Sequence, residues 1–508
     1  MLFTAALRHG RSRSARGFAS VVNQLYQPGS PSRHLEAPPP QPAQRSAVDV
    51  DKAAVLANHD REWSREELAD AAQASAMFTW GASGPMGAGA IDIVKSDGCY
   101  FWDGAGKKYL DFNSQAMCLH QGHTPHPSIV DAVTAQLREA PYAYPGMTMV
   151  PVRAKLCALL SDIFPGHINT FMFPSSGAEA NEAGMRFAKL YTGRSKILAQ
   201  YRSYHGGTNA TMMATGDFRR WPSEPGMPGI KHFFNPYPYS FKWGESEADV
   251  TQAALLQLRE VLQYEGPQNV ASIMLESVVG TNGLLVPPAG YMEGMRAMCD
   301  EHGILIHCDE VMAGFGRTGN MFGFQATSDS FVPDIVTFAK GVNGAFLPLG
   351  GIGIADHMAE HFRGAPNWYG STYNGHPVVL ASAYAALKQL LRGGYVENCR
   401  AMAPHMEAGF ERLAAAHPCI KQARGLGLFW AMDIQKNRAG DFIGEVEQPM
   451  HPAVGAFKAA LNEHGMFTMM RGHSIFANPP LIINQQQIEE GFDIFDKCLH
   501  ILDDAMED

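Results

Sequence analysis

Short, almost purely apolar runs that each end at a charged residue constrain the fold of this chain more than any other feature. Three of them read VASIMLESV, GILIHCDEV and DIVTFAKG, and stretches with helical periodicity lie between them. Apolar strands that alternate with helices are typical of a parallel sheet with both faces covered. The pattern therefore predicts an α/β fold built on a mostly parallel sheet.

The charged residues that end these runs are Glu276, Asp309 and Lys340. In open parallel sheets, ligands bind beyond the carboxyl ends of the strands. Because all three residues lie at such ends, their shared position is the strongest functional signal in the residues themselves.

Two of these positions have a functional and a structural interpretation when each is considered alone. A buried Asp309 needs a partner, which is either the protonated ring nitrogen of a ligand or the next turn that it caps. Lys340 is either a desolvated amine nucleophile that forms a Schiff base or a surface lysine. A metal site of His302, His307 and Asp309 is disfavoured because His302 precedes the strand. We expect no metal.

Residues 174–182, PSSGAEANE, place small residues before a helix that we expect to begin near Glu179. Small residues let backbone N–H groups approach an anion, and a helix N-terminus adds partial positive charge. The segment predicts a phosphate cradle or, alternatively, an ordinary N-cap turn. A phosphate cradle, an acid for a pyridinium nitrogen and a Schiff-base lysine are together what pyridoxal phosphate requires.

Other segments support the same organisation. GCYFWDGAGKKYLDF predicts a hairpin that turns at residues 103–107, and residues 60–78 predict a helix with a capping box of Ser64 and Glu67. NTFMFPSSGAEANEAGMRFAKLYTG predicts a strand, a tight turn and a helix. VVLASAYAALKQLL predicts a long amphipathic helix, and GLFWAMDI predicts a short strand of a smaller second domain.

The first 35 residues differ in charge from the rest of the chain. They hold five arginines and no Asp or Glu, and several serines lie among them. Such a segment is typical of an organelle transit peptide, and we expect a mitochondrial address, with a chloroplast address or a plain basic tail as alternatives. The Pro-rich run APPPQPAQ follows as a linker.

Composition excludes several classes of function. The net charge of -10 argues against a domain-wide basic face for nucleic acid, and we find no apolar run long enough for a transmembrane helix. The 8 cysteines are scattered without a C-x-x-C pair, which argues against a disulfide scaffold and a Cys-built zinc site.

From about Trp80 to the C-terminus, the chain resembles the class III, fold-type-I pyridoxal-phosphate aminotransferases. Nine motifs in order carry the resemblance: DGAGKKYLDF, GHTPHPSI, SSGAEANE, YRSYHGG, LESVVGTNG, DEVMAGFGRTG, PDIVTFAKG, STYNGHP and RGLGLFWAM. The resemblance implies a large cofactor-binding domain over residues 121–380. It also implies a smaller α+β domain built from residues 48–120 and 381–508, after a transit peptide and linker over residues 1–47.

The resemblance also implies roles for individual residues. Lys340 should hold pyridoxal phosphate as a Schiff base, Asp309 should pair with its ring nitrogen, and Tyr204 and Val311 should lie against its two faces. The other implied cofactor contacts are Ser176, Gly177, Ala178, His205, Glu276 and, from the neighbouring subunit of a homodimer with shared active sites, Thr372.

For the substrate, the resemblance implies that Arg424 binds a carboxylate; a structural salt bridge before a strand is the alternative. Trp80, Tyr142 and Tyr144 are expected either to line the pocket or to be core or interface aromatics. Ala178 stands where many relatives have serine, so one phosphate contact is expected to be missing.

The implied reaction is a two-half ping-pong transfer of an amino group to an oxo acid such as pyruvate. FNSQAMCLHQGH, YAYPG, RSYHGGTNATMMATGDFRRWPSEPGMPG and NPPLII most resemble enzymes that act on omega-amino acids such as taurine or β-alanine. Alanine–glyoxylate and 4-aminobutyrate aminotransferases are the nearest alternatives, and a glutamate-semialdehyde-type aminomutase is a more distant one.

Overall fold

The computed structural model describes residues 51–81, 90–444 and 451–507, and the chain divides into two units, Met1–Ala90 and Ile91–Asp508. In the first unit, helices α2 (Lys52–His59) and α3 (Arg65–Ser75) are described. The predicted capping box is confirmed, since Glu67 N donates to Ser64 Oγ (3.1 Å) and Ser64 N donates to Glu67 Oε2 (2.8 Å). The expected transit peptide and Pro-rich linker lie outside the described residues.

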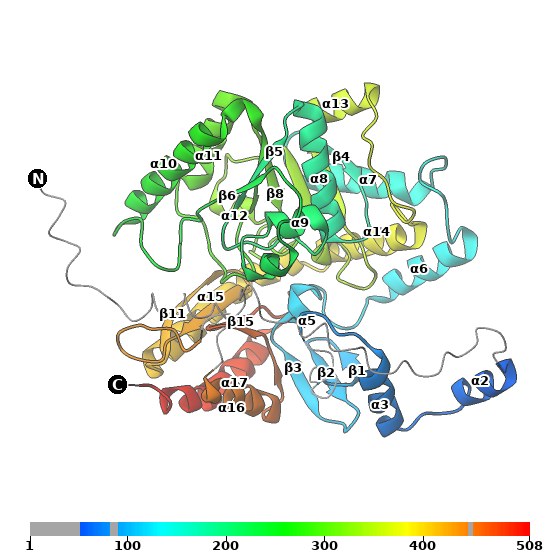
Figure 1. Ribbon diagram of the computed structural model, residues 1–508. Helices are drawn as coiled ribbons and strands as arrows, with labels where there is room; N and C mark the ends of the chain where they lie inside the picture. The colour runs from blue at the N-terminus through cyan, green and yellow to red at the C-terminus, as the bar shows by residue number, and fades with distance from the viewer. Residues whose placement is uncertain (1–50, 82–89, 445–450, 508) are drawn as a thin grey trace, which may run out of the picture. The chain divides into compact units, whose positions relative to one another are not determined.

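The second unit contains the sheet that the apolar runs predicted (Figure 1). Its seven strands are β4 (Ile168–Met172), β5 (Lys196–Gln200), β6 (Ile230–Phe233), β7 (Val270–Glu276), β8 (Leu305–Asp309), β9 (Ile335–Phe338) and β10 (Gly351–Ala355). They are ordered β4-β10-β9-β8-β7-β5-β6. Strand β10 runs antiparallel to both neighbours, whereas the strands from β9 to β6 run parallel. The mostly parallel sheet is confirmed.

Helices cover both faces of this sheet. They are α7 (Pro151–Ile163), α8 (Gly177–Thr192), α9 (Asn209–Ala214), α10 (Glu247–Glu265), α11 (Tyr291–His302), α12 (Phe324–Thr327), α13 (Asp356–Gly364) and α14 (Pro377–Arg392). Helix α6 (Pro127–Glu139) packs against α14. Alternate strand residues face opposite layers: Ile273 and Leu275 pack in the core with α7, α10, α11 and α14, and Met274 packs in the core with α8, α9 and α13. Burial on both faces explains why β7 reads as a continuous apolar run.

Two smaller sheets come from the two ends of the second unit. Strands β1 (Ile93–Asp97), β2 (Tyr100–Asp103) and β3 (Lys108–Asp111) join β13 (Met466–Phe467), with β13 parallel to β3. The other sheet has the order β11 (Ile420–Leu426), β12 (Phe429–Ile434), β15 (Ser474–Ala477) and β14 (Met470–Arg471). The hairpin of β2 and β3, the strand β12 and the joint use of N- and C-terminal segments are as predicted, whereas β1 was not predicted.

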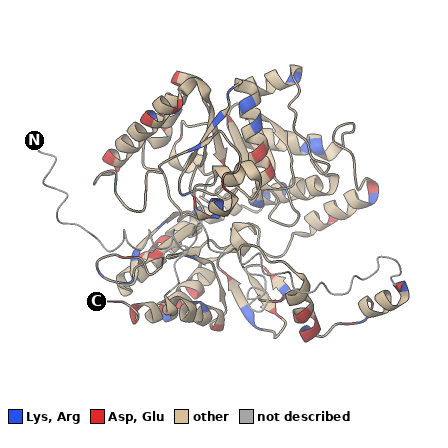
Figure 2. Cartoon of the chain, viewed as in Figure 1, with Lys and Arg blue, Asp and Glu red and all other residues tan. Residues whose placement is uncertain are grey.

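In the part of the chain that the structure describes, the remaining elements are α5 (Ser114–Met117), α15 (Tyr395–Ala416), α16 (Pro452–Glu463), α17 (Gln485–Asp503) and the 3-10 turns η2 (Phe218–Ser223), η3 (Pro267–Asn269) and η4 (Lys340–Val342). Figure 2 shows acidic and basic residues interspersed over the helices. Among the described residues, no helix has both the length and the hydropathy that a membrane span requires.

Candidate active site

The three strand-end residues lie at one edge of the seven-stranded sheet, as the sequence predicted. Glu276 ends β7, Asp309 ends β8, and the two face each other across the ladder. Asp309 also faces Thr337 of β9, and Lys340 follows β9 as the first residue of η4. Parallel strands place their carboxyl ends together, so an amine and two carboxyl groups share this edge.

Asp309 is almost buried, with 4% of the residue exposed, and its hydrogen bonds are unevenly distributed. Oδ2 accepts from Asn181 Nδ2 (2.7 Å) and from His205 Nδ1 (2.9 Å), whereas Oδ1 accepts from the backbone N–H of Val311 (3.0 Å). An ionised carboxylate has about four acceptor sites, so Oδ1 retains the capacity to accept from a protonated ring nitrogen. The predicted partner of Asp309 therefore fits the structure.

Glu276 is a buried acid that supports the backbone around the site. It accepts hydrogen bonds from the N–H groups of Tyr204 (2.9 Å) and Gly280 (2.8 Å). Burial raises the pKa of Glu276 to about 7, a shift that nearby His205 opposes and the charge of Asp309 increases. Glu276 thus positions Tyr204, the residue predicted to stack on the cofactor.

The predicted phosphate cradle lies at the start of α8, which begins at Gly177 and so two residues earlier than expected. Ser176 caps this helix, since its Oγ accepts from Glu179 N (3.2 Å). A Cβ atom at Gly177 would lie 2.8 Å from Cγ2 of Val311, so only glycine allows Val311 this close to the helix start. The structure therefore places Val311, predicted to face the ring, against the predicted phosphate cradle.

A second close approach brings the SYHGG motif to the same helix. A Cβ atom at Gly206 would lie 2.5 Å from Cβ of Ala178, and the φ of +135° at Gly206 also favours glycine. The structure thus holds Ala178 beside the segment of Tyr204 and His205. This arrangement fits pyridoxal phosphate, because the residues expected at its ring nitrogen, ring faces and phosphate occur together.

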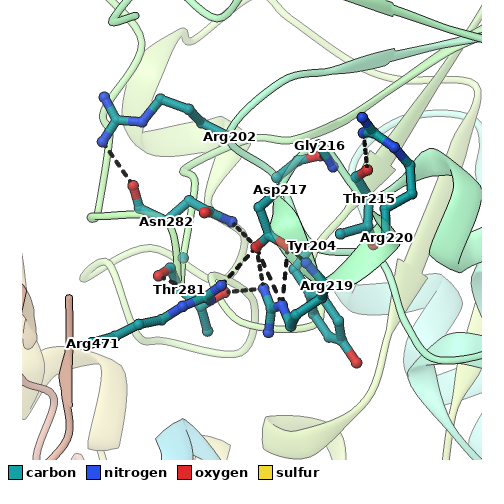
Figure 3. Close-up of polar contacts among 12 residues, drawn as sticks. Arg202, Tyr204, Thr215, Gly216, Asp217, Arg219, Arg220, Thr281, Asn282 and Arg471 are labelled. Atoms are coloured by element: carbon teal, nitrogen blue, oxygen red, sulfur yellow. Dashed lines mark hydrogen bonds and ion pairs between the residues drawn. The ribbon is translucent and has the colours of Figure 1, made fainter. Parts of the chain in front are cut away.

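A basic group beside Tyr204 was not among the predicted site residues (Figure 3). The guanidinium of Arg219 lies 3.6 Å from the centre of the Tyr204 ring. Arg219 Nη2 (2.7 Å) and Arg471 Nη2 (2.8 Å) both pair with Oδ2 of Asp217. Two guanidinium groups therefore face one carboxylate next to the predicted cofactor position. Arg219 lies in the segment TGDFRRWPSEPG, which carried part of the substrate resemblance, so the sequence contained an indication of this residue.

Four arginines bond the short segment of residues 281–283. Arg471 Nη1 donates to the carbonyl of Thr281 (3.4 Å), and Arg219 Nη2 donates to its hydroxyl (3.0 Å). Arg202 Nη2 donates to the carbonyl of residue 282 (2.9 Å), and Arg424 donates to that of residue 283. We call Arg202, Arg219, Arg424 and Arg471 the arginine cluster.

Arg424 is held in an ion pair, which was the alternative interpretation of this residue. Its Nη1 and Nη2 atoms bond the two carboxylate oxygens of Asp433 at 2.6 and 3.0 Å. Although burial raises the pKa of Asp433, the charge of Arg424 and hydrogen bonds outweigh it and lower this pKa, which favours the carboxylate that the ion pair requires. Arg424 therefore does not present a free fork to a substrate in this structure.

Thr372 and Tyr142 form a separate, exposed group. The Tyr142 hydroxyl donates to the carbonyl of Thr372 (2.9 Å), and its ring contacts Tyr373. Within the described residues, Tyr142 contacts this segment rather than the strand-end residues. Trp80 lies in the first unit, and its predicted role in the pocket stays a prediction.

The metal alternative receives no support from the described side chains. His302 is the last residue of α11, and His307 Nε2 bonds Thr337 Oγ1 (3.1 Å). Among the described residues, the group with donor atoms close enough for a metal is His417, which caps the end of α15, with His500 and Asp503 at the end of α17.

Comparison with known proteins identifies the family. The family model for class-III aminotransferases matches residues 84–499. The chain is 31% identical to the putrescine–pyruvate aminotransferase of Pseudomonas aeruginosa, over 81% of this chain and 91% of that protein. It is 30% identical to the 4-aminobutyrate aminotransferase of Escherichia coli, over 82% and 95%.

Solved structures give the same result. A taurine:2-oxoglutarate aminotransferase from Bifidobacterium kashiwanohense, in complex with pyridoxal phosphate and glutamate, superposes with a TM-score of 0.83. It is 38% identical in sequence and covers 88% of this chain and 100% of its own. An (S)-enantioselective omega-transaminase from Thermomicrobium roseum superposes with a TM-score of 0.81 at 30% identity, covering 87% and 99%.

Proposed function

Because the chain belongs to the class-III aminotransferases, which depend on pyridoxal phosphate, we propose that it transfers the amino group of an acidic omega-amino acid to an oxo acid. The donor is of the taurine or β-alanine type, with a sulfonate or carboxylate at the end opposite the amine. Pyruvate is the acceptor that the sequence resemblance favours.

The excess of positive charge beside Tyr204 carries this proposal. Arg219 and Arg471 share the single carboxylate of Asp217, and both side chains are at most 15% exposed. Sulfonates and carboxylates pair strongly with guanidinium groups, and the attraction increases where water is excluded. We assign the acid group of the donor to Arg219 and Arg471, which share one carboxylate, rather than to Arg424, which has the carboxylate of Asp433 to itself.

Three side chains of this protein then have separate roles in the reaction. When bound, pyridoxal phosphate supplies the carbonyl that captures the donor amine and the ring that accepts electrons. Lys340 Nζ would hold the proton taken from the donor carbon. Asp309 would keep the ring nitrogen protonated, and Tyr204 would orient the ring.

A panel of donors and acceptors tests the proposal. Purified protein loaded with pyridoxal phosphate is given taurine, β-alanine, 4-aminobutyrate or putrescine, each with pyruvate, glyoxylate or 2-oxoglutarate. We expect taurine and β-alanine to be turned over with pyruvate. If both fail while 4-aminobutyrate with 2-oxoglutarate is turned over, the substrate proposal is wrong. Turnover of an amino-aldehyde without any oxo acid would instead indicate an aminomutase.

We also propose a homodimer in which Thr372 reaches the phosphate bound by the partner subunit. Thr372 is exposed, and large apolar side chains on the two segments beside it are exposed as well: Tyr142, Tyr144, Met147, Met149, Trp368 and Tyr373. Such an exposed apolar patch marks a protein interface. Light scattering after size exclusion should give twice the mass of one chain, and a monomer that retains full activity would contradict the shared site.

The mitochondrial address is likewise a proposal and depends on the basic, acid-free N-terminus. A fusion of residues 1–47 to a fluorescent protein should enter mitochondria. Accumulation in plastids or diffuse fluorescence would contradict it.

A further inference from the structure

A chain of buried polar groups extends from Oδ2 of Asp309, whereas Oδ1 is the oxygen left for the predicted ring nitrogen. Asn181 Nδ2 donates to Asp309 Oδ2 (2.7 Å) and to the carbonyl of His205 (2.8 Å). The Thr337 hydroxyl donates to Asn181 Oδ1. His307 Nε2 lies 3.1 Å from the same hydroxyl. Asn181, Thr337 and His307 are each fully buried.

The donors in this chain all point toward Asp309. Both amide hydrogens of Asn181 are used on oxygen acceptors, so its Oδ1 must accept, and the Thr337 hydroxyl is the donor. That hydroxyl has one hydrogen, so it accepts from His307, which must carry its proton on Nε2. His307 Nδ1 is then a lone pair, and it is buried without a partner. One arrangement of hydrogens therefore satisfies these contacts.

His307 is suited to end this chain as a neutral ring. Burial lowers the pKa of His307 to about 3, against the opposing effect of Asp309. A Cβ atom at Gly184 would collide with this ring, so α8 packs directly on it. The ring is thereby fixed in position without adding a charge near the ring-nitrogen site.

We propose that Thr337 and His307 are positioning residues, which fix the amide of Asn181 so that it donates to Asp309 and keeps that carboxylate ionised and oriented. Hydrogen bonds to the charged form of an acid stabilise it. Without the Thr337 hydroxyl, Asn181 Oδ1 loses its donor, and only the acceptors at Nδ2, which are Asp309 and the carbonyl of His205, still orient the amide. An amide that is held less firmly would donate less well to the charged form of Asp309.

A rival explanation is that these groups only fill the core between α8 and the sheet. The rival predicts that loss of the Thr337 hydroxyl changes stability alone. Our proposal predicts a change in how the protein holds the cofactor and in how its activity depends on pH.

The test compares Thr337→Val, which removes the hydroxyl at nearly constant volume, with Thr337→Ser, which retains it. Ser272→Ala is the matched control, because Ser272 is a fully buried hydroxyl of the same sheet with no hydrogen-bond partner. For each variant, we would measure the Kd of pyridoxal phosphate by equilibrium dialysis, the thermal midpoint of the cofactor-free protein, and kcat against pH. The contrast uses whichever donor the wild type accepts, so it does not depend on the substrate proposal.

We expect Thr337→Val to weaken cofactor binding by about tenfold and to move the acid limb of the kcat profile to higher pH by about one unit. Thr337→Ser and Ser272→Ala should resemble the wild type in both respects. The proposal is overturned if Thr337→Val lowers only the thermal midpoint, or if the serine variant is as impaired as the valine variant.

If Thr337→Val gives no soluble protein, substitutions at His307 provide the same contrast. His307→Gln retains an N–H donor, and His307→Leu does not. The leucine variant should show the higher Kd and the shifted acid limb, and equal behaviour of the two variants would overturn the proposal.

Discussion

The strand-end carboxylates and the arginine cluster both contact Tyr204. They differ in how the charge of their side chains is balanced by neighbouring groups. Glu276 accepts from the backbone of Tyr204, whereas Arg219 lies over the ring of the same residue. The acids are buried and accept hydrogen bonds from backbone N–H groups, an amide and an imidazole. The arginines outnumber the acids that they pair with, since Asp217 and Asp433 pair with three guanidinium groups. Arg202, the fourth member of the cluster, bonds backbone carbonyls instead.

This difference separates two tasks. Carboxyl groups whose pKa depends on burial and hydrogen bonds are suited to control a proton on the cofactor. Guanidinium groups remain charged at any physiological pH and are suited to hold an anion. The comparison therefore predicts that changes on the acid side alter pH dependence, whereas changes on the arginine side alter the choice of donor.

Lys340→Ala should have the largest effect, because it removes the amine that the reaction requires with every donor. We expect loss of transamination by about a thousandfold or more for every donor, together with loss of the bound-cofactor absorbance shift. The matched control is Lys231→Ala, an exposed lysine on the edge strand β6. Retained activity in the Lys340 variant would contradict the mechanism.

Arg219→Gln should lower activity toward acidic donors selectively. Loss of a charge-assisted contact to a buried anion costs on the order of 2 kcal/mol, so kcat/KM for taurine or β-alanine should fall by roughly 30-fold. For propylamine, which lacks an acid group, kcat/KM should change little.

The matched control for this prediction is Arg220→Gln. Arg220 is the next residue of η2, but it pairs with Glu224 and with the carbonyl of Thr215 instead. Equal losses for taurine and propylamine in the Arg219 variant would show that the residue is structural.

Glu310→Gln should have the smallest effect. It tests whether burial raises the pKa of an acid in the region of the strand ends. Glu310 is buried and accepts from Ser277 and from the N–H groups of residues 323 (2.6 Å) and 324 (3.1 Å). Burial raises the pKa of Glu310 from 4.5 to about 7, against the effect of these hydrogen bonds. The folded state therefore holds a proton that the unfolded state releases.

The sign of this effect follows from proton linkage. Between pH about 4.5 and about 7, the folded state binds more protons than the unfolded state, so stability falls as pH rises. Above pH about 7, this one group lowers the free energy of unfolding by on the order of 3 kcal/mol. The cofactor-free Glu310→Gln protein should lose less of its thermal midpoint than the wild type between pH 5 and pH 7.5. Identical pH slopes would contradict a raised pKa at this position.

The strand-end residues were predictable because their signal is local. An apolar run that ends at Glu276, Asp309 or Lys340 can be recognised without knowledge of its neighbours, and the parallel order of β7, β8 and β9 then brings the three together. The helix start at the predicted phosphate cradle was predictable for the same reason, although α8 begins two residues earlier than expected.

The arginine cluster was not predictable in this way. Its members come from η2, from β11, from β14 and from the loop after β5, and they meet only on residues 281–283. The pairing of Arg424 with Asp433 depends on the register of the β11–β12 hairpin, in which Arg424 faces Ala431. The chain behind Asp309 likewise depends on β8 and β9 being neighbours, which places Thr337 opposite Asp309.

The most direct test of the account is the first half-reaction of the wild type, followed through the bound-cofactor absorbance without any oxo acid. Taurine or β-alanine and propylamine are mixed separately with the loaded protein, so that only the acid group of the donor differs. We predict that the acidic donors convert the cofactor at least about tenfold faster at equal subsaturating concentration. Equal rates for propylamine and the acidic donors would contradict the central claim that the arginine cluster selects an acidic amino donor.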